Sequence, residues 1–123
     1  IAASVAHEMG HCFRESRSFV ANYEVDEDEF KGIQNTGGFG PKPEMVYKQE
    51  LFADTVAILY AKENAGNDAD YVIESMIQAR EKFSANDPTH NTAKMLNRLI
   101  AAKMTRQGDE TLGLAATRLL SAL

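Results

Sequence analysis

The sequence is poor in cysteine and in basic residues, and it contains no long apolar run. Its one cysteine, Cys12, excludes an internal disulfide bond. A single cysteine fits a reducing compartment, either the cytoplasm or one that a secreted effector enters. A membrane-spanning helix needs about 20 successive apolar residues, and no stretch approaches that length. The net charge of −5 disfavours a nucleic-acid partner, because a nucleic-acid binder normally carries a basic stripe.

The chain also lacks a recognisable start. Ile1 is not a natural initiator, and no signal peptide is visible. We therefore expect that sequence preceding Ile1 belongs to the protein and is absent here. The 123 residues, of which 44% are apolar, are enough for one domain with a real core, and we assign 1–123 to that domain.

The apolar pattern predicts a mainly α fold with at most a short strand or hairpin. A period-two alternation through Phe19, Ala21, Tyr23 and Val25 suggests the strand, over 18–25. Acidic residues at 24–29 and the Gly/Pro-rich stretch 35–43 are typical of loops. The second helix is apolar around much of its circumference, which predicts that it is buried. We expect helices over about 2–16, 43–62, 68–83, 93–104 and 109–122.

One stretch of the first predicted helix carries a chemical signature. His7, Glu8 and His11 form the H-E-x-x-H motif of zinc hydrolases. Residues four apart lie on one face of a helix, so His7 and His11 can present two imidazole nitrogens to one ion. Glu8 lies one residue further round, where it can reach a zinc-bound water as a general base. The motif therefore predicts a Zn²⁺ cofactor and hydrolytic chemistry.

Catalytic zinc on such a helix needs a third protein ligand, which is either His90 or a carboxylate. The residues after His11 lack the glycine and third histidine of the longer metzincin pattern. Glu50 is the better candidate, since an unpaired carboxylate on a buried helix would be costly. Asp54 follows four residues later on the same helix face, where it can accept the distal N–H of a ligating histidine and orient its ring.

The two motifs together resemble the gluzincin peptidases, in which a glutamate on a later helix completes the zinc site. The E-x-x-A-D form at Glu50 and Asp54 is similar to the CAAX-prenyl-protease-like family, and its E-x-x-A-N variant resembles the ImmA/IrrE-like group. The resemblance implies zinc ligation by His7, His11 and Glu50, with Glu8 as the base. It also implies a zincin-like helical domain, and we expect the upstream sheet of such a domain to precede Ile1.

Four other residues are candidates for a role at the site or in the core. His90 follows a predicted turn, and it either stabilises the oxyanion of the reaction or simply begins a helix. Tyr47 either donates to that oxyanion or packs in the core, and we favour the core. Cys12 is expected to be a small core residue. Gly10 is expected to permit close approach of another element or of the substrate.

These features predict a zinc-dependent peptidase that acts on a protein or peptide substrate. The metal chemistry would be shared by a zinc hydrolase of non-peptide bonds. An alternative from another class is a non-catalytic helical interaction module, either a regulator or an effector, with a structural or degenerate metal site. Elemental analysis of the purified protein separates this alternative from the enzyme.

Overall fold

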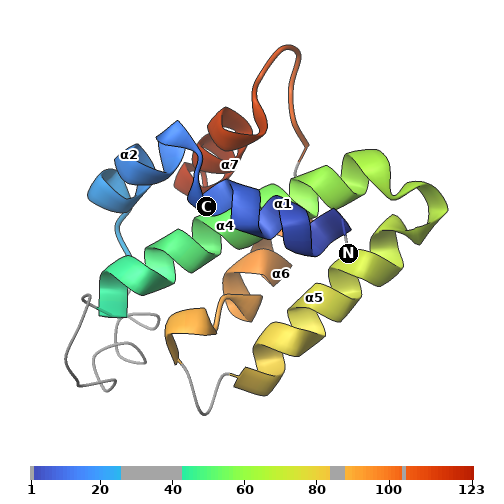
Figure 1. The fold of residues 1–123 in the computed structure, drawn as a ribbon, viewed down its shortest axis with the longest axis horizontal. Coiled ribbons are helices and arrows are strands. Elements are labelled where there is room, and N and C mark those ends of the chain that lie inside the picture. Colours follow the sequence, from blue (N-terminus) through green and yellow to red (C-terminus); the bar gives the residue numbers. More distant parts are fainter. Residues whose placement is uncertain (1, 26–42, 84–87, 104) are drawn as a thin grey trace.

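The computed structural model describes residues 2–25, 43–83, 88–103 and 105–123. Every regular element within these residues is helical, which confirms the mainly α prediction (Figure 1). None of the helices in this part of the chain is long and apolar enough to cross a membrane. The elements are α1 (Ala2–His11), α2 (Arg14–Asn22), α4 (Pro43–Asn64), η1 (Gly66–Asp68), α5 (Ala69–Phe83), η2 (Pro88–His90), α6 (Ala93–Ala101) and α7 (Leu112–Ser121).

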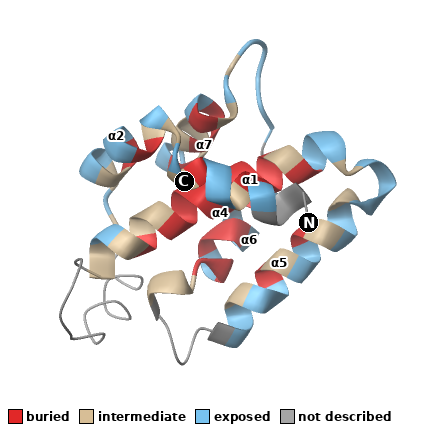
Figure 2. Cartoon of the chain, viewed as in Figure 1, coloured by how far each residue is buried: buried red, intermediate tan, exposed pale blue. Residues whose placement is uncertain are grey.

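The long helix α4 is the centre of the molecule. Every residue from Leu51 to Leu59 is buried, as its apolar circumference predicts. The helices α1, α2, α5, α6 and α7 all contact α4, and α1 makes the most extensive contacts of these. Figure 2 shows the buried residues concentrated on α4 and on the helix faces turned toward it. The side chains of α4 are therefore packed against the surrounding helices on most sides.

The predicted strand over 18–25 is wrong, and so is the single first helix over 2–16. The helix α1 ends at His11, Phe13 has an extended backbone with φ −68° and ψ 140°, and α2 begins at Arg14. Within α2 the helical period decides the packing, because Phe19 stacks on Tyr23 with ring centroids 4.7 Å apart. Ala21, which the alternating pattern placed with them, is exposed. The apparent alternation was thus a coincidence of a short amphipathic helix.

The break after α1 also overturns the expectation for Cys12. Its thiol is exposed, because the residue lies in the turn that follows His11 rather than within a continuing helix.

The other predicted helices are found at 43–64, 69–83, 93–101 and 112–121. The acidic residues at 26–29 and the Gly/Pro-rich residues 35–42 lie outside the described part of the chain.

Gly10 allows α1 to lie directly against α4, as the sequence suggested. An ideal Cβ at this position would lie 2.9 Å from the Cα of Ala53 and 3.3 Å from the Cβ of Val56. Real Cβ atoms do not approach backbone atoms so closely, so one helix would have to move. Because His7 and His11 lie on α1 and Glu50 on α4, this contact also sets how far apart their side chains lie.

We expect Gly10→Ala to lower the free energy of unfolding by about 1–3 kcal/mol, since a methyl group forced into a packed contact costs about that much. Alanine's higher helix propensity, worth about 1 kcal/mol, offsets only part of the loss. Gly113→Ala is the matched control, because its Cβ would mainly meet the flexible carboxylate end of Glu15. Urea unfolding of both variants measures the difference. Equal stabilities would contradict the proposed role of the α1–α4 contact.

Candidate metal centre

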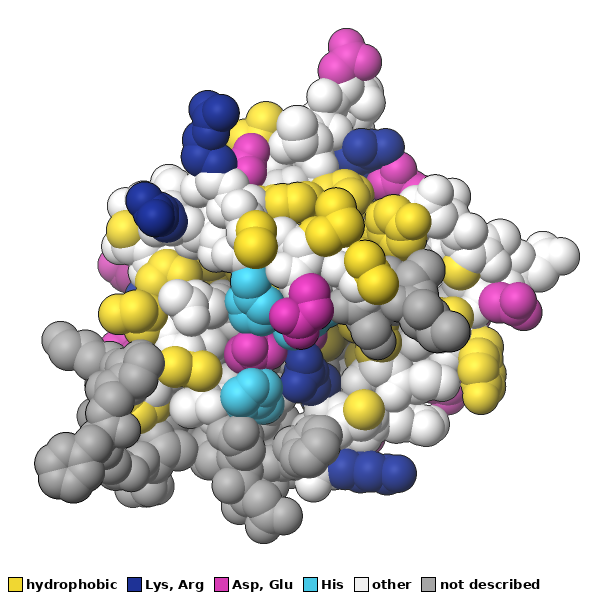
Figure 3. Space-filling model, in the orientation of Figure 1, with side chains coloured by type: hydrophobic (Ala, Val, Ile, Leu, Met, Phe, Trp, Pro, Cys, Tyr) yellow, Lys and Arg dark blue, Asp and Glu magenta, His cyan; other side chains and the backbone are white. Residues whose placement is uncertain are grey.

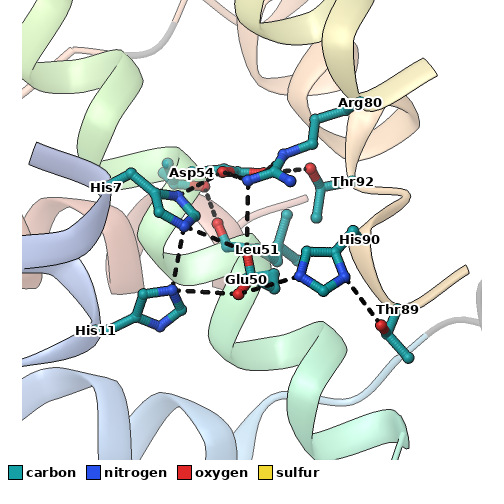
Figure 4. Close-up of polar contacts among 10 residues, drawn as sticks. His7, His11, Glu50, Leu51, Asp54, Arg80, Thr89, His90 and Thr92 are labelled. Carbon is teal, nitrogen blue, oxygen red and sulfur yellow. Dashed lines mark hydrogen bonds and ion pairs between the residues drawn. The ribbon is translucent and has the colours of Figure 1, made fainter. Parts of the chain in front are cut away.

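The candidate site lies where α1 crosses α4 (Figure 4). His7 and His11 project from one face of α1 toward Glu50 and Asp54, which are one turn apart on α4. The remaining polar side chains around them come from α5, from η2 and from the residue that precedes α6. Residues from distant parts of the chain therefore meet around the predicted motif.

Three side chains bring four candidate ligand atoms close together. The Nε2 atoms of His7 and His11 lie 3.1 Å apart. Glu50 Oε2 lies 3.3 Å from His7 Nε2, and Glu50 Oε1 lies 3.2 Å from His11 Nε2. Tetrahedral zinc with ligands at about 2.0–2.2 Å separates its ligand atoms by about 3.2–3.6 Å. The three residues therefore have nearly the spacing that one zinc ion requires.

The chemistry of this set also suits zinc. Two imidazoles and one carboxylate are a known ligand set for catalytic zinc, and they leave one coordination position open. The side chains are 13%, 28% and 12% exposed for His7, His11 and Glu50, so the site is sheltered but accessible. The same three residues emerge as a possible metal-holding group among the described residues. We therefore conclude that the residues present fit the predicted cofactor.

Asp54 lies behind this set and is completely buried. Its Oδ1 atom is 2.8 Å from His7 Nδ1, on the side of the ring away from Glu50. The buried Nδ1 atom has no other polar partner among the described residues. A carboxylate near Nδ1 favours the tautomer with a proton on that nitrogen, which leaves the Nε2 lone pair for a metal.

The charges of the cluster shift the proton affinities of its members. Contacts with Asp54 and then Glu50 raise the pKa of His7 to about 9, although burial opposes this shift. Burial raises the pKa of Glu50, but the contacts with His7 outweigh it and the pKa is lowered. The pKa of Asp54 is likewise lowered, because contacts with His7 and Arg80 outweigh its burial. In the metal-free protein His7 is therefore a cation between two carboxylates.

This arrangement predicts that the metal-free protein loses stability in alkaline solution. The pKa of His7 rises from 6.5 to about 9 on folding. The associated stabilisation is therefore fully present below pH 6.5 and is lost as the pH rises through about 9. A shift of this size corresponds to about 3–4 kcal/mol at most. Urea unfolding at pH 6 and pH 9.5, in the presence of a chelator, measures the loss.

The matched control for this prediction is His7→Gln, which cannot titrate in this range. We expect the decline between pH 6 and pH 9.5 to be clearly smaller in the variant. A decline of the same size in the variant would show that another group is responsible.

Glu8 and His90 border the cavity that contains this cluster. The cavity has a volume of about 500 Å³, and its polar lining includes the two motif histidines, Glu50 and Asp54. Glu8 is an exposed side chain at the cavity edge. Figure 3 shows histidine, acidic and basic side chains gathered on this face of the molecule. Glu8 is therefore accessible to a substrate that enters the cavity.

His90 approaches the cluster from η2. Its Nε2 atom lies 3.5 Å from Glu50 Oε1, and its Nδ1 atom lies 3.1 Å from Thr89 Oγ1. The ring thus faces the cavity, a position that the predicted oxyanion role requires. Tyr47 is 2% exposed and does not line the cavity, which supports the core interpretation.

Sequence reasoning missed two residues of the cluster, Arg80 and Thr92. Arg80 lies on α5, and its guanidinium donates to Asp54 from Nε at 2.9 Å and from Nη2 at 2.8 Å. Thr92 donates its hydroxyl to Asp54 Oδ2. A cation on the inner face of a helix is costly without an anionic partner, but the sequence around Arg80 does not show that this partner is Asp54.

A larger groove of about 750 Å³ lies on the other face of α5. Ile73, Ile77 and Ile100 contribute apolar surface to it, and none of the described residues that line it is a histidine or a cysteine. Its carboxylates belong to exposed residues of α5. We therefore place the candidate chemistry in the smaller cavity, where titratable groups converge.

Comparisons of the chain with protein-family models, with curated proteins and with solved structures found no match. The assignment of the site consequently rests on the geometry and chemistry of its residues.

Proposed function

We propose that the protein is a zinc-dependent peptidase of the gluzincin type. The observation that carries this proposal is the convergence of His7 Nε2, His11 Nε2 and both oxygens of Glu50, with contacts of 3.1–3.3 Å. Four ligand-type atoms so close together would be unfavourable without a shared proton or cation. The neighbouring exposed Glu8 then supplies a general base, which a purely structural metal site does not need.

In the proposed reaction His7, His11 and Glu50 hold the ion. Zinc, when bound there, would polarise the scissile carbonyl and make water a stronger nucleophile at neutral pH. Glu8 accepts a proton from the attacking water as the new C–O bond forms. It returns that proton to the amine nitrogen as the C–N bond breaks, so that the carboxylate is regenerated.

His90 has a separate role in this proposal. Its Nε2 atom faces the cavity beside Glu50 Oε1, at 3.5 Å. A proton on this nitrogen would donate to the carbonyl oxygen while negative charge develops there. Arg80 is less suited to that role, because two of its nitrogens already donate to Asp54.

The proposal is tested by comparing the zinc-loaded protein with its Glu8→Gln variant on a pool of peptides and unfolded proteins. New N-termini that appear only with the unsubstituted protein, and that disappear with a chelator, would support peptidase activity. Bound zinc without any new N-termini would favour the alternatives, a zinc hydrolase of non-peptide bonds or a helical interaction module with a structural metal site. Absence of bound metal would remove the basis of the proposal.

A further inference from the structure

We propose that Arg80 is a positioning residue of the metal centre. Its planar guanidinium holds Asp54 in the one orientation that places Oδ1 behind His7, and His7 in turn presents Nε2 to the ion. This inference rests on the proposed metal centre and adds to it a residue from a third helix, α5, which carries no motif ligand.

The geometry of the contact is a two-pronged fork. Arg80 Nε donates to Asp54 Oδ2 at 2.9 Å, and Arg80 Nη2 donates to Asp54 Oδ1 at 2.8 Å. The guanidinium is planar and matches both carboxylate oxygens at once, so it fixes the plane of the carboxylate as well as its position. A lysine carries the same charge but cannot form this fork. The Arg80→Lys substitution therefore separates the effect of charge from the effect of orientation.

Asp54 is held from three further directions. The Thr92 hydroxyl donates to Oδ2 from the start of α6, and the backbone of α4 fixes the Cα atom. The remaining neighbour is His7 Nδ1, which lies 2.8 Å from Oδ1. Because Asp54 is fully buried, loss of a donor would leave its carboxylate with fewer partners at a poorly solvated position. Loss of the fork would leave the Thr92 hydroxyl on Oδ2 to orient the carboxylate, and one hydrogen bond does not fix the carboxylate plane.

Arg80 also touches a proposed ligand. Its Nη2 atom lies 3.4 Å from Glu50 Oε2, so its positive charge lies beside the position that the ion would occupy. If Arg80 acted only through charge, its removal would strengthen metal binding, because one repulsive cation would be lost. If it acts by positioning, its removal weakens metal binding. The two explanations therefore predict opposite signs.

The test is a titration with cobalt(II), whose visible absorption reports ligand geometry, in competition with a chelator of known affinity. We expect Arg80→Lys and Arg80→Met each to weaken cobalt binding by about 10–100-fold, which is typical for residues that orient metal ligands. Both variants should also change the absorption spectrum of the cobalt that remains bound. Circular dichroism confirms that each variant is folded.

Arg118→Lys is the matched control. Arg118 forms the same fork on Glu110, with contacts of 2.8 and 2.9 Å, but it lies outside the cavity that contains the cluster. This variant should bind cobalt as the unsubstituted protein does.

If the Arg80 variants do not fold, Thr92→Val removes the other donor to Asp54 and should weaken binding, whereas Thr92→Ser should restore it.

Two outcomes would overturn the inference alone, provided that the unsubstituted protein binds cobalt. Arg80→Met that binds more tightly would show that only charge matters. Arg80→Lys with unchanged affinity and spectrum would show that the fork is unnecessary. If the unsubstituted protein binds no cobalt, both this inference and the proposed function fail.

Discussion

The Glu8→Gln variant is expected to bind zinc with one equivalent per chain and to lose peptide hydrolysis. Glutamine has the shape of glutamate but cannot accept the proton of the attacking water, and removal of a general base costs about 10²–10⁴-fold in rate. Glu8 is exposed and is not one of the three proposed ligands, so the fold and the metal ligands should be unaffected. The value of kcat/KM for a cleaved peptide and elemental analysis of the protein measure the two effects.

The matched control for this variant is Glu74→Gln. Glu74 is also an exposed helical glutamate, but it lies on the face of α5 that lines the larger groove. Hydrolysis by this variant should equal that of the unsubstituted protein. Turnover that survives in Glu8→Gln would remove Glu8 from the mechanism, and zinc loss in the same variant would make it a ligand.

The first motif could be predicted from the sequence because its geometry is local. The spacing of His7 and His11 fixes their relative position once a helix forms, whatever the rest of the fold does. Glu50 and Asp54 were identifiable for a different reason, since they stand in the stretch 50–61, whose other residues are all apolar except Thr55. The structure places these four residues together at the crossing of α1 and α4.

Arg80 and Thr92 could not be identified in this way, because their role depends on how helices distant in sequence pack. Nothing near Arg80 in the sequence distinguishes it from a cation at the edge of an amphipathic helix. Its partner Asp54 lies 26 residues earlier, on another helix. Thr92 has the sequence position of an ordinary helix cap, yet its hydroxyl donates to Asp54, 38 residues away.

The errors in the fold arose where local patterns are short. The stretch 18–25 contains few residues, so a helical face and a strand face can share the same apolar positions. Packing decided between them, because the stacking of Phe19 on Tyr23 requires the spacing of one helical turn. The exposure of Cys12 was missed because the first helix was predicted to continue to residue 16. In the structure α1 ends at His11, and Cys12 lies in the turn before α2.

Glu50→Gln is expected to abolish stoichiometric zinc binding at micromolar concentrations. The substitution replaces the only grouped carboxylate with a neutral amide, which is a weak zinc ligand, and it leaves His7 and His11 as a two-residue site. We expect affinity to fall by more than about 100-fold, beyond what loss of an orienting residue costs. Titration with zinc, in competition with a chelator, measures the change.

Two variants serve as controls for this expectation. Glu44→Gln alters a partly buried glutamate at the start of the same helix, which pairs with Lys48, and should leave zinc binding unchanged. His90→Ala should also retain zinc, because His90 is proposed to act on the carbonyl oxygen rather than on the ion. If Glu50→Gln binds zinc normally and His90→Ala does not, the third ligand is His90, whose Nε2 atom lies 3.5 Å from the carboxylate that it would replace. That result would keep the metal centre but exclude the gluzincin arrangement.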